Sequence, residues 1–222
     1  MDFQALRKEY EQEGMIERDL PECPFACFRQ WLSTAIACCP GDWFEPNAMC
    51  LATSDLQGHV TARVVLLKGV TETGIRFFTN YHSVKGKQLA SNSQASVVFH
   101  WPYLGQQVRL EGAVEKTIRA VSDDYFQSRP KSAQLGAWVS EQSQRIENRQ
   151  VMESRLETLA QRYQQEKVPL PEGWGGYELT PRRWEFWQGR ASRLHDRIVY
   201  EKNDPSQANT AGSAWSRYRL AP

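Results

Sequence analysis

The chain has 222 residues, of which 41% are hydrophobic and 24% are charged, as in an ordinary globular protein. Its 27 basic and 26 acidic residues leave a formal net charge of +1, so no overall field draws it to nucleic acid or to an anionic membrane. Any site for an anion must therefore be built locally.

The first twenty residues mix Arg, Lys and Glu and predict a mobile arm or a short helix. They hold no apolar stretch of the kind found in secretory signals, and no apolar run in the chain approaches the length of a membrane span. We predict an arm over 1–20 and a single domain over 21–222, in a cytoplasmic protein. The five cysteines follow no zinc or disulfide spacing, so we expect reduced and mostly buried thiols, and no metal site.

Apolar residues at helical spacing predict a helix over 24–38, which Pro40-Gly41 ends. Short segments rich in Val, Thr and Phe then predict antiparallel strands, separated by turn residues. We expect strands over 48–55, 59–70, 75–80, 95–101, 106–116, 175–181, 182–189, 194–201 and 213–222, and helices over 84–90, 120–127 and 142–165. Residues 202–212 read as an exposed hairpin loop. The order of these elements predicts an α+β fold, mainly β, around a barrel-like antiparallel sheet.

Two segments of the first half place basic residues beside aromatic and hydroxyl groups. Arg63 and Lys68 lie five apart, so an ideal strand would point them to opposite faces, and for this segment alone two solvated charges are the favoured interpretation. The other segment, FFTNYHSVKGKQ, passes from a strand into a helix and predicts a phosphate site with Lys85. The alternative there is a helix capped by Ser83, with its lysines in water.

Two further groups lie in the second half. Arg193, His195 and Arg197 alternate, so on one strand they would share a face and repel unless an anion or an electron-rich ring lies among them. Tyr125 and Arg129 are four apart on a predicted helix and could hold a second phosphate. The stretch 141–145 adds amides and a hydroxyl at the start of the predicted long helix, where plain capping is the alternative.

The sequence contains no Walker loop, no GxGxxG motif after a strand, no HExxH and no GxSxG. Hydride or electron chemistry must then come from a cofactor that is held in another way.

Taken together, the chain from about Leu6 to Pro222 resembles the pyridoxine (pyridoxamine) 5′-phosphate oxidase family. The resemblance rests on the ordered stretches RVVLLKG, FFTN, SVKGKQ, QQVRLEG, YFQSRPKSAQLGAWVSEQS, WGGY, EFWQG, RLHDRIVY and RLAP. It implies an FMN-binding split β-barrel with flanking helices, assembled as a homodimer with FMN at the subunit interface. It also implies that O2 oxidises pyridoxine 5′-phosphate and pyridoxamine 5′-phosphate to pyridoxal 5′-phosphate, with release of H2O2.

The same resemblance implies roles for individual residues. The expected FMN contacts are Arg63, Val64, Val65, Leu66, Lys68, Phe78, Thr79, Ser83, Lys85, Gln107, Gln142, Ser143, Trp187 and Arg197. The expected substrate contacts are Lys68, Tyr125, Arg129, Ser132, Arg193 and His195, with Arg7 and Tyr10 from an arm that closes over the site. Arg193 and His195 are also the expected catalytic residues, placed over the pyridine ring at the reacting carbon.

Two positions depart from the family pattern. Val84 stands where an Arg commonly follows the serine, and Ala133 stands where a second serine is usual, with Ser132 expected to substitute in part. Each lost contact would weaken binding by about 1–3 kcal/mol. Two other functions stay open: a flavin oxidase of phenazine-type tricyclic substrates, and a carrier that binds pyridoxal phosphate or FMN with little catalysis.

Overall fold

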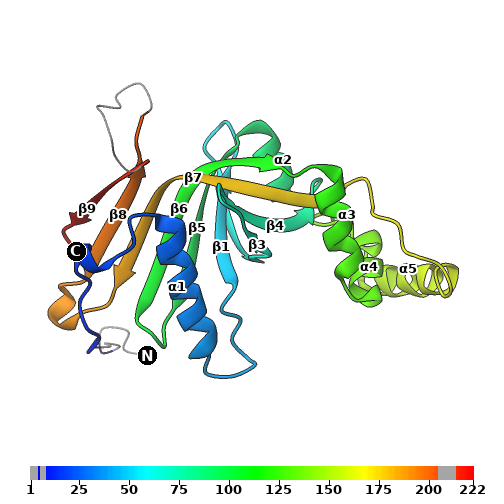
Figure 1. The fold of residues 1–222 in the computed structure, drawn as a ribbon. Coiled ribbons are helices and arrows are strands. Elements are labelled where there is room, and N and C mark those ends of the chain that lie inside the picture. The colour runs from blue at the N-terminus through cyan, green and yellow to red at the C-terminus, as the bar shows by residue number, and fades with distance from the viewer. Residues whose placement is uncertain (1–4, 6–8, 205–213) are drawn as a thin grey trace.

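The structure is a computed structural model that describes residues 5, 9–204 and 214–222. In this part of the chain, nine strands join one antiparallel sheet in the order β2-β1-β5-β6-β7-β4-β3, with β8 paired to β7 and β9 to β8 (Figure 1). The strands are β1 (Ala48–Ser54), β2 (Val60–Leu66), β3 (Gly69–Val70), β4 (Ile75–Asn80), β5 (Gln94–Trp101), β6 (Gln106–Lys116), β7 (Trp174–Gln188), β8 (Asp196–Lys202) and β9 (Trp215–Leu220). The predicted α+β, mainly β fold is confirmed.

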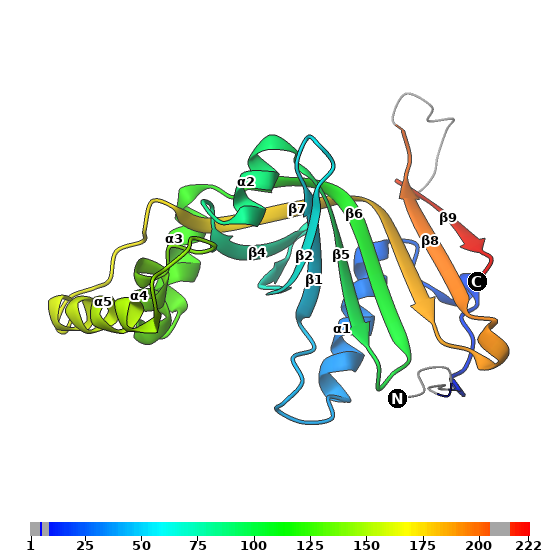
Figure 2. The same cartoon turned by 180° about the vertical axis from the view of Figure 1, so that it is seen from behind.

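Helices flank the sheet on one face and at one end (Figures 1 and 2). They are α1 (Pro24–Ala37), α2 (Val84–Ser91), α3 (Arg119–Ser128), α4 (Lys131–Val139) and α5 (Arg149–Arg162), with short 3-10 turns at Glu17–Asp19 and Ala191–Arg193. α1 lies along the sheet, and α3, α4 and α5 gather at the end opposite β8 and β9. No helix of the described residues is both long and apolar enough to cross a membrane.

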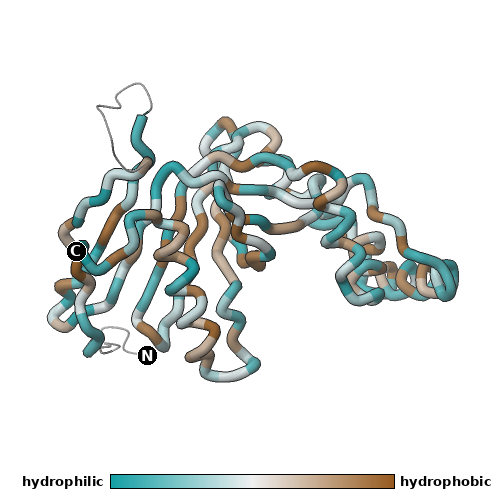
Figure 3. Tube along the Cα trace, in the orientation of Figure 1, coloured by the Kyte–Doolittle hydropathy of each residue, from teal (hydrophilic) through white to brown (hydrophobic). Residues whose placement is uncertain are grey.

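The main core forms between α1 and the inner face of the sheet. Phe28 of α1 is fully buried, with its ring 5.0 Å from that of Phe99 and 5.4 Å from that of Trp184. Burying such aromatic side chains provides much of the free energy that drives folding. Hydrophobic and hydrophilic residues alternate along the strands (Figure 3), so the opposite face of the sheet is free to carry polar groups.

β7 replaces two predicted strands by one long strand. Its first half pairs with β4, its second half with β8, and β6 pairs along both. The register with β6 shifts between Glu111 and Gly112, where Arg182 is the extra residue of a β-bulge next to Pro181. Gly112 is required there because a Cβ atom would lie 2.1 Å from the carbonyl oxygen of Thr180. The bulge explains why Pro181 looked like a strand end.

Three other predictions are corrected. The long helix was expected from Gln142, but α5 begins after Asn148, whose side chain accepts a hydrogen bond from the Val151 N–H and caps the helix. α4 was not predicted, because the break at Arg129-Pro130 hid a helix that starts directly after the proline. The five cysteines are free as expected, but only Cys27 is buried. Most of the expected hairpin loop (205–212) and the residue Arg7 lie outside the described residues.

Candidate active site

A cavity of about 520 Å³ opens between the sheet and helices α3 and α4, a size typical of small-molecule sites. Eleven of the residues that line it were predicted from the sequence: Arg63, Val64, Val65, Leu66, Lys68, Phe78, Thr79, Lys85, Tyr125, Arg129 and Gln142. Strand β2, the segment after it, β4, α2, α3 and the turn after α4 supply these residues. Segments far apart in the sequence therefore meet at one cavity.

The charge of the cavity is its most informative property. Four of its side chains are cationic, Arg63, Lys68, Lys85 and Arg129, and no Asp or Glu is among the described residues that line it. None of the four forms an ion pair within the described chain, although many other arginines do. Four unneutralised cations around one cavity indicate a site for an anionic ligand.

Arg63 and Lys85 form the first cationic group of the cavity. The Lys85 Nζ donates to Gln142 Oε1 at 2.9 Å, to Thr79 Oγ1 at 3.1 Å and to Ser83 Oγ at 3.3 Å, so its partners are all neutral. Burial, together with the charge of Arg63, lowers the pKa of Lys85 to about 8. Two like charges held close together in this way favour an anion between them.

Ser83 is confirmed as the cap of α2, because its side chain accepts from the Gly86 N–H. Lys85, however, is buried at the cavity, and only Lys87 is exposed as the capped-helix alternative expected. Gln142 and Ser143 lie in a turn before α5, not on a helix, since Ser143 has a φ of 72°. Ser143 lies outside the cavity lining but accepts a hydrogen bond at 3.3 Å from the N–H of Val84, next to Lys85.

Arg129 forms the second cationic group with aromatic side chains around it. Its guanidinium carbon lies 4.8 Å from the ring centre of Trp174, and Tyr125 stacks on Phe78 at 3.9 Å. The Nη1 atom of Arg129 is buried and has no hydrogen-bond partner in the described structure. Leaving such a donor unsatisfied costs about 1–3 kcal/mol or more for a charged group, which a ligand oxygen would recover.

Lys68 follows β2 and lines the same cavity as Arg63, although five residues separate them. The chain leaves the strand after Leu66, so the rule of alternating faces does not apply to Lys68. Ala133 also lines the cavity, whereas Ser132 is exposed and does not. The structure therefore places the expected substitute hydroxyl of Ser132 away from the cavity.

A second cluster of predicted residues lies on the outer face of β6, β7 and β8. Gln107, Trp187 and Arg197 are direct partners across these three strands, so their side chains share one face in a single row. Arg197 donates from Nε to Glu185 Oε1 at 2.8 Å and from Nη1 to the Ala221 carbonyl at 3.0 Å. The terminal RLAP stretch thus helps to hold Arg197.

Glu185 anchors this row from a nearly inaccessible position, with 3% of its surface exposed. It accepts from Arg109 Nη2 at 2.8 Å as well as from Arg197. Burial alone would raise the pKa of Glu185, but the hydrogen bond from Arg197 and the neighbouring arginine charges outweigh it and lower the pKa below its ordinary value. Glu185 therefore stays ionised and orients Arg197.

The turn between β7 and β8 carries Arg193 and His195, which differs from the prediction of one strand. Ser192 and Arg193 have φ values of 55° and 61°, a conformation that residues other than glycine rarely adopt and that often occurs at functional sites. The Arg190 N–H donates to His195 Nδ1 at 3.1 Å, which leaves Nε2 free to carry a proton outward. Arg193 is exposed in the turn and Arg197 is the second residue of the following strand, so the three side chains do not form one row.

Tyr10 of the amino-terminal segment packs on this second cluster. Its ring lies 5.6 Å from both Trp187 and His195, with nearly perpendicular planes. Gly189 leaves room for the ring, because a Cβ atom there would lie 2.3 Å from Tyr10 Cδ1. Tyr10 therefore lies beside the turn that carries Arg193 and His195, and its expected contact with the substrate stays a prediction.

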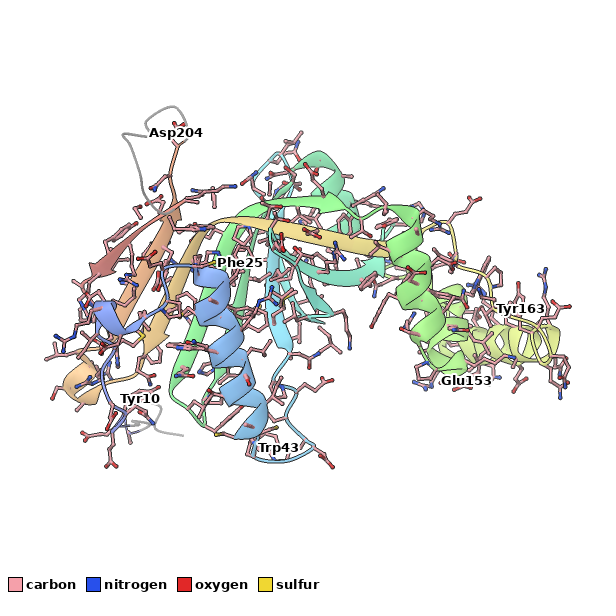
Figure 4. All side chains as sticks on the ribbon, in the orientation of Figure 1. Tyr10, Phe25, Trp43, Glu153, Tyr163 and Asp204 are labelled. Carbon is pink, nitrogen blue, oxygen red and sulfur yellow. The ribbon has the colours of Figure 1, made fainter. Side chains whose placement is uncertain are left out.

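The cavity and the second cluster lie toward opposite ends of the protomer. The turn after β7 is at the left of Figure 1, α3 and α4 are at the right, and the reversed view of Figure 2 keeps this separation. Tyr10 lies on the side of the turn, far from Tyr163 at the end of α5 (Figure 4). One protomer therefore does not bring all the predicted site residues together.

Comparison with known proteins matches two regions of the chain. Residues 42–163 match the family described as pyridoxamine 5′-phosphate oxidase, and residues 174–222 match the pyridoxine 5′-phosphate oxidase C-terminal dimerisation region. The chain belongs to the pyridoxamine 5′-phosphate oxidase family. The second cluster and β8 and β9 all lie in, or pack against, the region that the family uses for dimerisation.

Similar members of this family match almost end to end. The pyridoxine/pyridoxamine 5′-phosphate oxidase of Rhodopirellula baltica is 47% identical, over 98% of this chain and 95% of its own. That of a Synechocystis strain is 48% identical, over 98% and 96%. Among solved structures, PhzG of Burkholderia lata superimposes with a TM-score of 0.83 at 27% identity, over 92% of this chain and 95% of its own. An FMN-binding protein of Nostoc punctiforme, at 17% identity and a TM-score of 0.67, shares the fold.

Six residues that line the cavity were not predicted from the sequence to belong to the site. They are Asn80, Gly136, Ala137, Ser140 and Trp174, together with Ala133, which had been noted only as a departure. Trp174 belongs to the quoted WGGY stretch, but nothing in that stretch indicated contact with Arg129. The small residues of α4 were missed because the helix itself was not predicted.

Proposed function

We propose that this chain is an FMN-dependent oxidase that converts pyridoxine 5′-phosphate and pyridoxamine 5′-phosphate to pyridoxal 5′-phosphate. O2 takes up two electrons and two protons and is released as H2O2, and in the case of pyridoxamine 5′-phosphate water displaces the nitrogen as ammonia. The observation that carries the proposal is the cavity with four cations and no lining carboxylate in the described chain. Both the cofactor and the substrate carry a phosphate, and the cavity offers two cationic groups. The 47% identity to enzymes named for this reaction supports it.

The residues of the cavity fit FMN. Arg63 and Lys85, with Thr79 and Gln142 beside them, would hold its phosphate, and the buried, unpartnered Nη1 of Arg129 offers a donor to the phosphate of the substrate. FMN, when bound, supplies the acceptor of the hydride that leaves C4′ of the substrate. The protein then has to bind and orient the two ligands, because correct placement alone accounts for much of such a rate enhancement.

The site is completed, in this proposal, by a second copy of the chain in a homodimer. The row of Gln107, Trp187 and Arg197 and the turn with Arg193 and His195 would face the cavity of the partner. Two findings support this: the separation of the two clusters within one protomer, and the match of 174–222 to a dimerisation region. In a dimer with twofold symmetry, each chain then contributes to two sites.

Arg193 and His195 would act on the substrate ring. The Arg193 guanidinium would hold the ring against the flavin, and His195 would donate from Nε2 because its Nδ1 accepts from the Arg190 N–H. Tyr10 packs on both His195 and Trp187, so the amino-terminal segment would shield this half of the site from water. The arm over 1–20 and the cytoplasmic location stay predictions.

A spectroscopic experiment tests the proposed function directly. Pyridoxine 5′-phosphate added without oxygen to the protein loaded with FMN is expected to bleach the visible flavin bands, and air is expected to restore them with release of H2O2. Flavin bands that do not bleach would favour the phenazine-type alternative. The 27% identity to PhzG, which was solved in complex with tetrahydrophenazine-1-carboxylic acid, supports that alternative. A protein that stays inert after FMN is supplied would favour the carrier alternative.

The affinity for FMN should depend on pH through Lys85. Its pKa is lowered to about 8 by burial and by Arg63, so in the ligand-free protein the side chain loses its charge as the pH rises through that value. A phosphate monoester is already dianionic there, since its second pKa is about 6. We expect the FMN affinity to fall between pH 7.5 and 9 in fluorescence titrations. Lys85→Arg, which stays charged, should remove the decline, and a flat wild-type profile would contradict the assignment.

Val84 gives a second test of where the phosphate of FMN binds. It is 45% exposed at the first residue of α2, next to Lys85, where family members commonly have an arginine. Val84→Arg adds a cation at the helix N-terminus, and we expect FMN to bind about 10-fold more tightly. Ser91→Arg, at the last residue of the same helix, is the matched control and should leave the affinity unchanged. Equal affinity in Val84→Arg and wild type would count against this placement of the phosphate.

A further inference from the structure

Gln88 is a buried side chain of α2 whose amide makes three hydrogen bonds. Its Oε1 accepts from Thr53 Oγ1 at 2.6 Å and from Thr61 Oγ1 at 2.8 Å, and its Nε2 donates to the His59 carbonyl at 3.0 Å. The side chain is 7% exposed and does not line the cavity. It thus links α2 to strands β1 and β2 from behind the cavity wall.

The two threonine hydroxyls connect Gln88 to Arg63 by hydrogen bonds. Each hydroxyl has one hydrogen, which it donates to Gln88, so its lone pairs are free to accept. Arg63 donates from Nη1 to Thr53 Oγ1 at 2.7 Å and from Nη2 to Thr61 Oγ1, and a further bond from Nη1 reaches the Leu51 carbonyl. Gln88 therefore turns the two hydroxyl hydrogens away from the guanidinium, which can only donate, and leaves the threonine oxygens to accept from it.

This support is uncharged, unlike that of several other arginines in the protein. Arg197 and Arg109 share the carboxylate of Glu185, and Arg76 pairs with Glu178. Arg63 is held at three donor positions by neutral oxygens and forms no ion pair within the described residues. A carboxylate at position 88 would make the same two bonds with the threonines but would cancel the charge that attracts an anion.

We propose that Gln88 is a positioning residue that holds Arg63 rigidly while leaving its positive charge available to a phosphate in the cavity. This proposal rests on the proposed function, because it assumes that Arg63 and Lys85 receive the phosphate of FMN. It predicts that the affinity of the cavity for FMN depends on the charge of the residue at position 88 as well as on its hydrogen bonds.

The test compares Gln88→Glu and Gln88→Met with the wild type in fluorescence titrations with FMN at pH 8. Gln88→Glu adds a carboxylate that is ionised at this pH, and we expect binding at least about 10-fold weaker. Gln88→Met loses the hydrogen bonds to both threonines without adding a charge, so it should bind FMN more weakly than the wild type but more tightly than Gln88→Glu. A residue with only a structural role would make Gln88→Met, which keeps none of the hydrogen bonds, at least as weak as Gln88→Glu. Gln94→Glu, an exposed residue at the start of β5, adds the same charge elsewhere and should not change the affinity.

Each result bears on the proposal. A Gln88→Glu variant that binds FMN as tightly as the wild type, or no more weakly than Gln88→Met, would overturn it. Wild-type protein that binds no FMN would overturn the proposed function as well, whereas tight wild-type binding with an unaffected Gln88→Glu variant overturns only the role of Gln88. Should Gln88→Glu fail to fold, Thr61→Val tests the same hydrogen bonds: it should bind FMN several-fold more weakly than the wild type, and unchanged affinity would overturn the proposal.

Discussion

Arg193→Ala is expected to lower turnover by about 100-fold or more while FMN stays bound, because the lost group orients the substrate ring and does not hold the cofactor phosphate. The residue lies in a turn with a left-handed backbone, stabilised by the bond from the Arg190 N–H to His195 Nδ1. Initial rates of H2O2 release with pyridoxine 5′-phosphate, together with the flavin content of the purified variant, measure the two effects separately.

The control for this variant is an arginine without a predicted ligand. Arg149 of α5 is exposed and pairs with Glu153 on the same helix, so Arg149→Ala should keep wild-type turnover. Wild-type turnover in Arg193→Ala would contradict the catalytic assignment. Loss of FMN from Arg193→Ala in proportion to the loss of activity would show that the turn serves the cofactor instead.

A heterodimer of Arg129→Ala and Arg193→Ala chains is expected to regain about half of the wild-type activity, because a twofold dimer with shared sites then keeps one site free of both changes. Each homodimer should be nearly inactive at low substrate concentration: Arg129→Ala loses the buried donor at the cavity, a cost of about 1.5–3 kcal/mol or 10- to 100-fold in substrate affinity. The two chains are co-expressed with different tags and purified on both before rates are measured.

The reverse pairing is the control for this experiment. A chain with both changes, paired with a wild-type chain, carries one defect in each shared site and should be nearly inactive. If each protomer instead held a complete site, this second heterodimer would keep about half of the activity and the first would have none. The two pairings therefore give opposite results for the two arrangements of the site.

Most of the fold could be predicted because its signals are local. Helix α1, the five strands from β1 to β6 other than the short β3, and the hairpin of β8 and β9 follow from apolar spacing and turn residues. Two of the failures share a cause: a local break signal was overridden by tertiary structure. Pro181 lies inside β7 because a bulge accommodates it, and Pro130 precedes a helix where only an interruption was expected.

In the candidate site, too, local signals were predicted and contacts between distant segments were not. Residues within one stretch, such as Phe78 and Thr79 or Arg63 to Leu66, were placed together correctly at the cavity. The supporting partners Gln88 and Glu185 were not found, because a buried glutamine or glutamate has no spacing that links it to an arginine on another strand. The alternation of Arg193, His195 and Arg197 was misleading, since it fits a strand while the backbone forms a turn.

The bulge in β7 has a consequence for how this protein can change over evolution. Trp174 at one end of the strand contacts the cavity, and Trp187 at the other end belongs to the row on the outer face. Arg182 contacts neither, yet as the extra residue of the bulge it sets the angle between the two halves of the strand. Deleting it would remove the bulge and shift the two ends of the strand relative to each other, whereas its largely exposed side chain, 3.7 Å from Glu111, leaves more freedom for substitution. At this position we expect the number of residues to matter more than their chemistry.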